Sequence, residues 1–129
     1  ALPEIGAATG VGLRFLVGMP RNFSGPMLLR EVEKLKLMGA SPYIVGVDFM
    51  GFEDNKIGEL EPYMQAIAAW AEAHDHEFTL RIHAGENRKN LTNVKESLRL
   101  AQQFGMRVRI GHAAHGLDEE AMAIAEALS

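Results

Sequence analysis

A histidine and a glutamate stand three residues apart, directly behind an apolar-rich run typical of a buried strand. The run covers residues 78–82, and His83-Ala84-Gly85-Glu86 follows it. An imidazole can bind a metal ion or move a proton, and a carboxyl group shielded from water can hold a proton and donate it. The small residues Ala84 and Gly85 let backbone and ligand approach closely. This spacing favours a metal-binding or proton-transfer site at the end of the strand.

Two further runs of strand character end in similar groups. His112 follows residues 108–111, and Asp48 follows residues 43–47 and opens a cluster that includes Gly51 and reaches Glu53. Taken singly, a histidine or a loop-capping carboxylate in such a place is often structural. In a parallel α/β fold, however, the carboxyl ends of the strands meet on one face, where these folds keep their active sites. We therefore expect these groups to lie together, with Asp48 orienting a neighbouring histidine.

A strand-then-helix pattern that repeats four times must position these residues. We expect strands at 13–18, 43–48, 78–83 and 108–112, and helices at 26–38, 62–74, from 91 to a stop at Gly105, and from 118 onward. The last helix is expected to bury Met122, Ala125 and Leu128, and residues 1–12 to form a loop or the tail of an earlier element. Alternation of this kind predicts an α/β fold with a parallel sheet. It is either a small open sheet or half of a TIM (β/α)8 barrel. No Gly-rich phosphate motif follows the first strand, which argues against a nucleotide-binding open sheet, and the polar residues at three strand ends favour the barrel.

Composition excludes several classes of protein. The chain has 129 residues, a formal net charge of −4 and no cysteine. The charge argues against binding nucleic acid or an anionic membrane, and the lack of cysteine excludes disulfides and Cys-based zinc sites. No run has transmembrane length or the pattern of a signal peptide. We expect residues 1–129 to form a single partial domain of a longer protein, cytoplasmic by default and otherwise secreted.

Several other histidines and arginines are not expected to take part in the chemistry. His74 and His76 are spaced like a metal-ligand pair, but they fall on a helix-to-strand connection, away from the expected active face, and we interpret them as solvated loop residues. His115 is interpreted as a loop residue. Arg81 and Arg109 lie inside strands, where a charge is unusual. They are expected to pair with acids on the covering helices or to extend to solvent.

Three motifs together resemble the adenosine deaminase family of zinc-dependent (β/α)8-barrel hydrolases. They are His83-Ala84-Gly85-Glu86, Arg109-Ile110-Gly111-His112 and the segment 46–53, and the resemblance runs from about residue 13 to 128 in the family's order. It implies the third to sixth βα units of the barrel. It also implies that His83 is a zinc ligand, that Glu86 protonates a purine ring nitrogen, and that His112 aligns and deprotonates metal-bound water. Gly51 would hold the purine through its backbone N–H, and Asp48 would support the histidines.

The resemblance implies hydrolytic deamination of adenosine or a related aminopurine to the 6-oxopurine, with release of ammonia. The family's first-strand His-x-His and its late aspartate ligand have no counterpart here, whereas a catalytic zinc needs about three protein ligands. We therefore expect an internal fragment, inactive alone, that binds zinc weakly or not at all and self-associates through exposed sheet edges. The expected partner is a purine nucleoside. Two alternatives remain: a non-catalytic half-barrel interaction or regulatory module, and a related metal-dependent amidohydrolase with another substrate.

Overall fold

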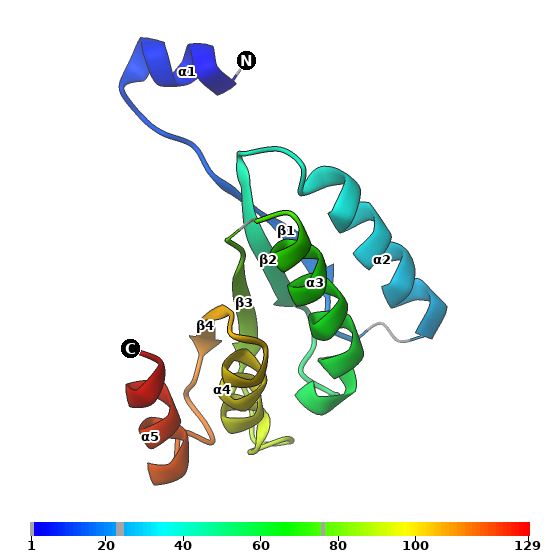
Figure 1. Cartoon of the computed structure of the whole chain (residues 1–129). Coiled ribbons are helices and arrows are strands. Elements are labelled where there is room, and N and C mark those ends of the chain that lie inside the picture. Colours follow the sequence, from blue (N-terminus) through cyan, green and yellow to red (C-terminus); the bar gives the residue numbers. More distant parts are fainter. Residues whose placement is uncertain (1, 23–24, 76) are drawn as a thin grey trace.

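Four parallel strands form one open sheet in the order β1-β2-β3-β4 (Figure 1). The computed structural model describes residues 2–22, 25–75 and 77–129. The strands are β1 (Phe15–Pro20), β2 (Ile44–Met50), β3 (Thr79–Ala84) and β4 (Arg107–His112). All three pairings are parallel. The four predicted strands are confirmed, each displaced by at most two residues at either end.

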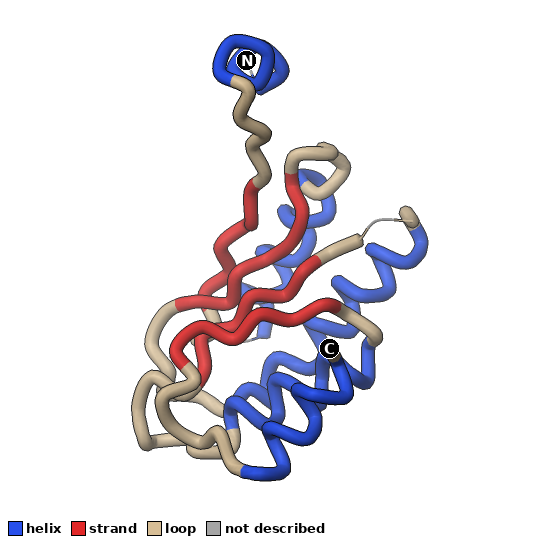
Figure 2. Tube along the Cα trace, turned by 90° about the vertical axis from the view of Figure 1, so that its left-hand side faces the viewer, coloured by secondary structure: helices blue, strands red, loops and turns tan. Residues whose placement is uncertain are grey.

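Helices connect the strands and cover one side of the sheet (Figure 2). They are α2 (Gly25–Met38), the 3-10 helix η1 (Ile57–Leu60), α3 (Glu61–Ala73), α4 (Asn93–Phe104) and α5 (Glu119–Leu128). A further helix, α1 (Leu2–Thr9), stands away from the sheet at the end of an extended segment (Figures 1 and 2). Residues 1–12 were expected to form either a loop or the tail of an earlier element. The loop prediction is wrong for residues 2–9, which form α1. That this segment is the tail of an earlier element stays a prediction.

The hydrophobic core lies between the sheet and the helices. Because side chains alternate along a strand, every second residue faces the helices. The residues at these positions in β2 and β3 are fully buried: Val47, Phe49, Leu80 and Ile82. Opposite them, the helices bury Leu28, Val32, Leu35, Leu60, Met64, Ile67, Val94 and Leu98. Burial of one such side chain contributes about 1.5–3 kcal/mol.

The other face of the sheet is open and carries polar side chains. By register, Gly18, Asp48, Arg81 and Arg109 form one row across the four strands. Parallel sheets are normally covered on both faces, so a sheet with one covered face has the architecture of a part of a (β/α)8 barrel. The prediction that Arg81 pairs with an acid on a covering helix is wrong. Its guanidinium donates to Asp48 Oδ2 of the neighbouring strand at 3.2 Å.

Helix α5 differs from the expectation. Met122 and Leu128 are exposed, Ala125 is partly buried against the core, and the fully buried residue of this helix is Ala121. The physical reason is that, within the described residues, α4 is its principal neighbour, and polar contacts link the two helices. Lys95 lies 3.1 Å from Asp118 and 3.0 Å from Glu120, and Arg99 also pairs with Glu120. A helix with one principal neighbour buries only a narrow strip of its surface.

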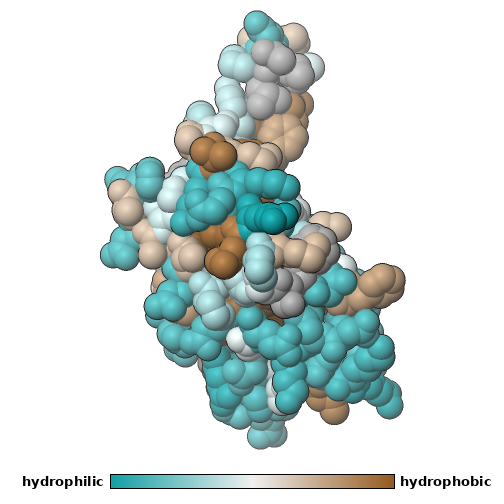
Figure 3. Space-filling view, turned by 90° about the vertical axis from the view of Figure 1, so that its right-hand side faces the viewer, coloured by the Kyte–Doolittle hydropathy of each residue, from teal (hydrophilic) through white to brown (hydrophobic). Residues whose placement is uncertain are grey.

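The outer surface is mainly hydrophilic, with separate hydrophobic residues. Figure 3 shows this for the side of the molecule on which α2 lies in Figure 1. The exposed apolar residues of α2 include Met27, Leu29 and Leu37. Among the described residues, no helix combines the length and the apolar character needed to cross a membrane.

We predict that acid loosens α5 before it affects the sheet. The pKa of Asp118 is lowered mainly by the hydrogen bond from the Ala121 N–H and, to a smaller extent, by Lys95. The pKa of Glu120 is lowered mainly by its hydrogen bond with Lys95 and, to a smaller extent, by Arg99. Carboxyl groups with depressed pKa values stabilise the fold above their ordinary pKa, and this stabilisation is lost as pH falls through the folded-state pKa values. Between pH 6 and pH 3, amide exchange in α5, corrected for intrinsic rates, should therefore rise.

Asp118→Ala should reproduce the loosening of α5 at neutral pH, because Asp118 also accepts the Ala121 N–H at 2.8 Å. Glu126→Gln, on the same helix and exposed, is the matched control. Protection of α5 that does not change with pH or with Asp118→Ala would contradict the prediction.

Self-association of the 129-residue chain stays a prediction. Within the described residues β1 and β4 each have one sheet neighbour, so backbone groups of both edge strands are available to another chain. A hollow of about 850 Å³, whose lining includes Leu16, Val45, Arg109 and Leu128, adds apolar surface beside them. Sedimentation velocity over a concentration series should detect dimers or larger species. Leu16→Lys should shift them toward monomer, whereas Leu29→Lys on α2 should not. A monomer at every concentration would count against the prediction.

Candidate active site

The residues that sequence analysis selected meet at the carboxyl end of the sheet. A hollow of about 590 Å³ lies there, and its lining includes His83, Glu86, His112 and Gly51. The rest of the lining consists of Met50, Phe52, Glu53, Asp54, Asn87 and Lys89. These residues come from the ends of β2, β3 and β4 and from the loops that follow. The expected convergence of the three motifs on one cavity is therefore present in the structure.

Asp48 lies beneath the hollow and contacts His83. Its Oδ1 is 3.2 Å from His83 Nε2, and its Oδ2 accepts the hydrogen bond from Arg81. The Asp48 and His83 atoms are both buried, and neither has a hydrogen-bond partner of good geometry among the described residues. Arg81 and Asp48 thus form an ion pair on the open face, and the carboxylate of that pair faces the imidazole of His83.

The imidazole of His112 completes the group from the next strand. Its Nε2 lies 3.7 Å from Glu86 Oε2, and its ring centroid is 5.2 Å from that of His83 in an edge-to-face arrangement. By register His112 pairs with Ala84, a residue on the helix-covered face. The backbone turns away from regular strand geometry here, since φ is 74° at His112 and 52° at Ala113. This local left-handed conformation costs about 1–3 kcal/mol per residue. With this backbone, the imidazole of His112 lies beside Glu86 and His83.

The turn after β3 requires glycine at position 85. Its φ is +78°, and a Cβ atom there would lie 2.6 Å from the carbonyl oxygen of His115 and 2.8 Å from Val94 Cγ2. The loop after β4 runs directly alongside, because the Ala113 N–H donates to the Ala84 carbonyl at 2.9 Å and the His115 N–H donates to the Gly85 carbonyl at 3.0 Å. His115 therefore contributes its backbone to the contact between the two loops.

A buried carboxylate holds this turn from below. Glu53 is 2% exposed, and its Oε1 and Oε2 accept the backbone N–H groups of Gly85 and Glu86, each at 2.9 Å. The side chain of Asn93 donates to Oε1 at 3.1 Å. Sequence analysis included Glu53 in a polar cluster without giving it a role. An acid two residues after a glycine resembles an exposed loop residue, and only the tertiary structure reveals its burial.

Sequence analysis missed Arg21 entirely. This side chain is fully buried; its guanidinium donates to the carbonyl oxygen of His83 and, at 3.1 Å, to that of Asn55. Burial lowers the pKa of Arg21 more than the nearby carboxylates of Glu53 and Glu86 raise it. Arg21 directly follows β1, just as the other site residues stand at or behind the ends of their strands. This shared position was the sequence signal that could have identified it.

Gly51 and Phe52 form one side of the hollow. Gly51 has φ +108°, a conformation that residues with a Cβ rarely adopt, so the chain can turn sharply after β2. Phe52 follows it and is 78% exposed. An aromatic ring and an unshielded stretch of backbone thus stand together at the rim of the cavity.

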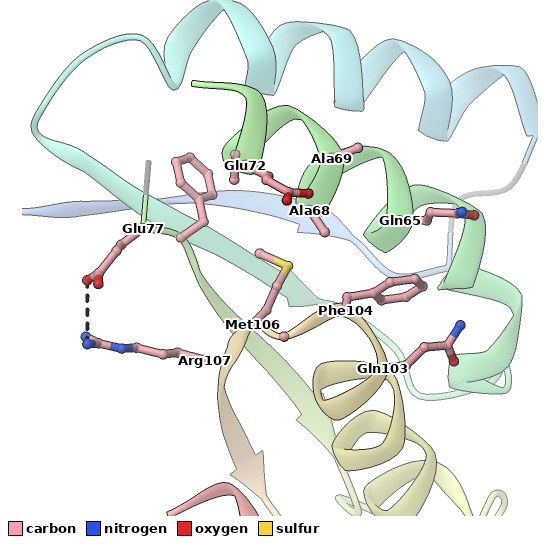
Figure 4. A pocket seen from close by; sticks show the side chains of 12 residues that line it. Gln65, Ala68, Ala69, Glu72, Glu77, Gln103, Phe104, Met106 and Arg107 are labelled. Atoms are coloured by element: carbon pink, nitrogen blue, oxygen red, sulfur yellow. Dashed lines mark ion pairs between the residues drawn. The ribbon is translucent and has the colours of Figure 1, made fainter. Parts of the chain in front are cut away.

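A second hollow lies at the opposite end of the sheet, between α3 and α4 (Figure 4). It measures about 620 Å³ and contains Phe104 and Met106, with an ion pair of 3.5 Å between Arg107 and Glu77 at its edge. None of the residues that sequence analysis selected for chemistry lines it. The cavity at the carboxyl ends of the strands is therefore the better candidate.

A comparison with protein families identifies the chain. A family model described as adenosine deaminase matches residues 1–128. The chain belongs to the adenosine deaminase family. No curated protein and no solved structure matched it.

The adenosine deaminase family is typically metal-dependent, and the cavity contains side chains that can bind a metal ion. The buried His83 Nε2 and Asp48 Oδ1 atoms lie 3.2 Å apart, and neither has a hydrogen-bond partner of good geometry among the described residues, so this pair of atoms could face a cation. Within residues 2–22, 25–75 and 77–129, however, no three His, Asp or Glu side chains are grouped so that they could hold a metal ion. A catalytic zinc takes about three protein ligands. The described residues do not complete such a site.

The other histidine pair does not contribute to this cavity. His74 is exposed, stacks on Trp70 with ring centroids 4.8 Å apart, and has its Nδ1 2.8 Å from the Trp70 carbonyl oxygen. The interpretation of His74 as a surface residue is confirmed. His76 lies outside the described residues.

We predict that Arg21 is required for stability. Arg21→Met would leave the His83 and Asn55 carbonyl groups without their charged donor, at a cost of about 2–4 kcal/mol in the free energy of unfolding. Arg21→Lys keeps the charge but loses the planar fork and should recover only part of that energy. Urea denaturation measures both values. Arg30→Met, at an exposed position of α2, should change stability by less than about 0.5 kcal/mol. Equal stability of Arg21→Met and the unmodified chain would contradict the prediction.

Proposed function

We propose that this chain carries the purine-binding and proton-transfer part of a hydrolytic deaminase that acts on adenosine or a related aminopurine. In this reaction water adds to the ring carbon that bears the amino group, the carbon–nitrogen bond breaks, and ammonia leaves as the 6-oxopurine forms. Family membership supports a hydrolase of this class. The observation that carries the proposal is that His83, Glu86, His112 and Gly51 line one cavity.

In the proposed mechanism, Glu86 is the acid. Its carboxyl group would donate a proton to the purine ring nitrogen next to the reacting carbon, which makes that carbon more electrophilic. Support comes from its position on the cavity wall, with its backbone fixed by Glu53. His112 Nε2 lies 3.7 Å from Glu86 Oε2, so the imidazole is near enough to exchange protons with this carboxyl group.

His112 is proposed to align the attacking water and to take its proton. An imidazole suits this role because one ring nitrogen can accept a proton while the other donates a hydrogen bond. Asp48 is proposed to hold the neighbouring His83 in place, an assignment supported by the 3.2 Å separation of their side chains. The Arg81 guanidinium in turn holds Asp48, which leaves one carboxylate oxygen directed at His83.

Gly51 is proposed to bind the substrate through its backbone N–H, which has no side chain of its own to shield it. The exposed ring of Phe52 beside it provides an apolar surface for a planar base. A purine nucleoside, with a flat aromatic base and polar edges, suits this combination. We also propose that His83 supplies one zinc ligand. Because the described residues do not complete a zinc site, the isolated chain should bind zinc weakly and be inactive alone.

We predict that the full-length protein carrying this sequence releases ammonia from an aminopurine, and that Glu86→Gln lowers kcat by about 10²–10⁴-fold. The amide has the shape of the acid but cannot donate the proton. Ammonia release from adenosine, adenine and AMP, measured in parallel, selects the substrate class. Glu59→Gln, at an exposed position of η1, is the control. Absence of ammonia release with all three compounds, or full activity of Glu86→Gln, would contradict the proposed function.

A further inference from the structure

Glu53 is the most deeply buried acid near the cavity and has no role in the chemistry proposed above. Both of its carboxylate oxygens are used, and all three partners are donors: the backbone N–H groups of Gly85 and Glu86 and the side-chain amide of Asn93. A carboxylate, which accepts without donating, suits such a set. The three bonds connect the loop after β2, the turn after β3 and the first turn of α4.

The two carboxylate oxygens of Glu53 bind different donors. Oε1 is shared between Gly85 and Asn93, whereas Oε2 accepts the N–H of Glu86 at 2.9 Å. The bond to Oε2 fixes the backbone from which the Glu86 side chain extends into the cavity. Arg21 fixes the carbonyl oxygen of His83 three residues earlier. Buried charged groups thus hold both ends of the segment 83–86.

We propose that Glu53 is a positioning residue that directs Glu86 toward His112 and the bound substrate. The proposal rests on the proposed function in so far as Glu86 is the acid. In this arrangement Glu53 accepts from two backbone N–H groups and from the Asn93 side chain, and neither donates to nor accepts from the substrate. The alternative is a purely structural role, in which replacement of Glu53 would weaken the whole fold uniformly.

Glu53→Gln separates these two roles. Glutamine has the same shape and keeps one carbonyl oxygen, which can serve the two donors at the Oε1 position. Its NH₂ group then faces the Glu86 N–H, donor against donor, so that the loss is confined to one bond. Hydrogen exchange of the Glu86 amide should become about tenfold faster or more. Exchange at Leu80 and Ile82, inside β3, should not change.

In the active full-length protein, Glu53→Gln should lower kcat by about 10- to 100-fold while KM changes little, because the acid is displaced rather than removed. In the double variant with Glu86→Gln, the second substitution should cost much less than it does alone. Glu59→Gln is the matched control for both measurements.

Unchanged exchange at Glu86, equal acceleration throughout the core strands, or full kcat despite faster exchange at Glu86 would each overturn the proposal. Failure of the proposed function looks different: the unmodified protein would release no ammonia, while the exchange result at Glu86 would stand.

Discussion

The site depends on a buried carboxylate that satisfies the backbone at the end of β3. Peptide N–H groups that leave a sheet beneath a cavity floor lose their strand partners and are costly to bury without new ones. Glu53 accepts two of them, from Gly85 and Glu86, and the side chain of Asn93 as well. Because Asn93 Oδ1 also accepts the N–H of Ile57 at 3.0 Å, one polar network ties the site to η1 and α4.

Sheet register places the remaining groups. Strands β2, β3 and β4 are paired without shifts, so Asp48, Arg81 and Arg109 share one row on the open face. His83 lies one step further toward the carboxyl end on the same face of β3, close enough for Asp48 to reach it. Alternation of side chains sends Leu80, Ile82 and Ala84 into the core instead. The same strands therefore supply both the hydrophobic core and the site.

The strands, the main helices and the convergence of Asp48, His83, Glu86 and His112 follow from sequence because they depend on local periodicity and on the parallel sheet. Other features depend on distant contacts. The burial of Arg21 and Glu53 arises from loops about 30 residues apart in the chain, and neither sequence context distinguishes them from exposed residues. The left-handed backbone of His112 has no sequence signal, since it is not a glycine. The apolar residues of α5 suggested a buried face, but among the described residues this helix packs mainly against α4, with Ala121 as its fully buried residue.

Contacts within the protein hold the backbone that carries His83, Glu86 and His112. Hydrogen bonds from Arg21 and to Glu53 fix the segment 83–86, and the Ala113 and His115 N–H groups fasten the next loop to it. None of these contacts uses the imidazole of His83. A ligand that binds this imidazole would therefore leave the backbone contacts of the segment 83–86 unchanged. The local fold of the motif thus depends on Arg21, Glu53 and the loop after β4, and not on groups bound at the His83 side chain.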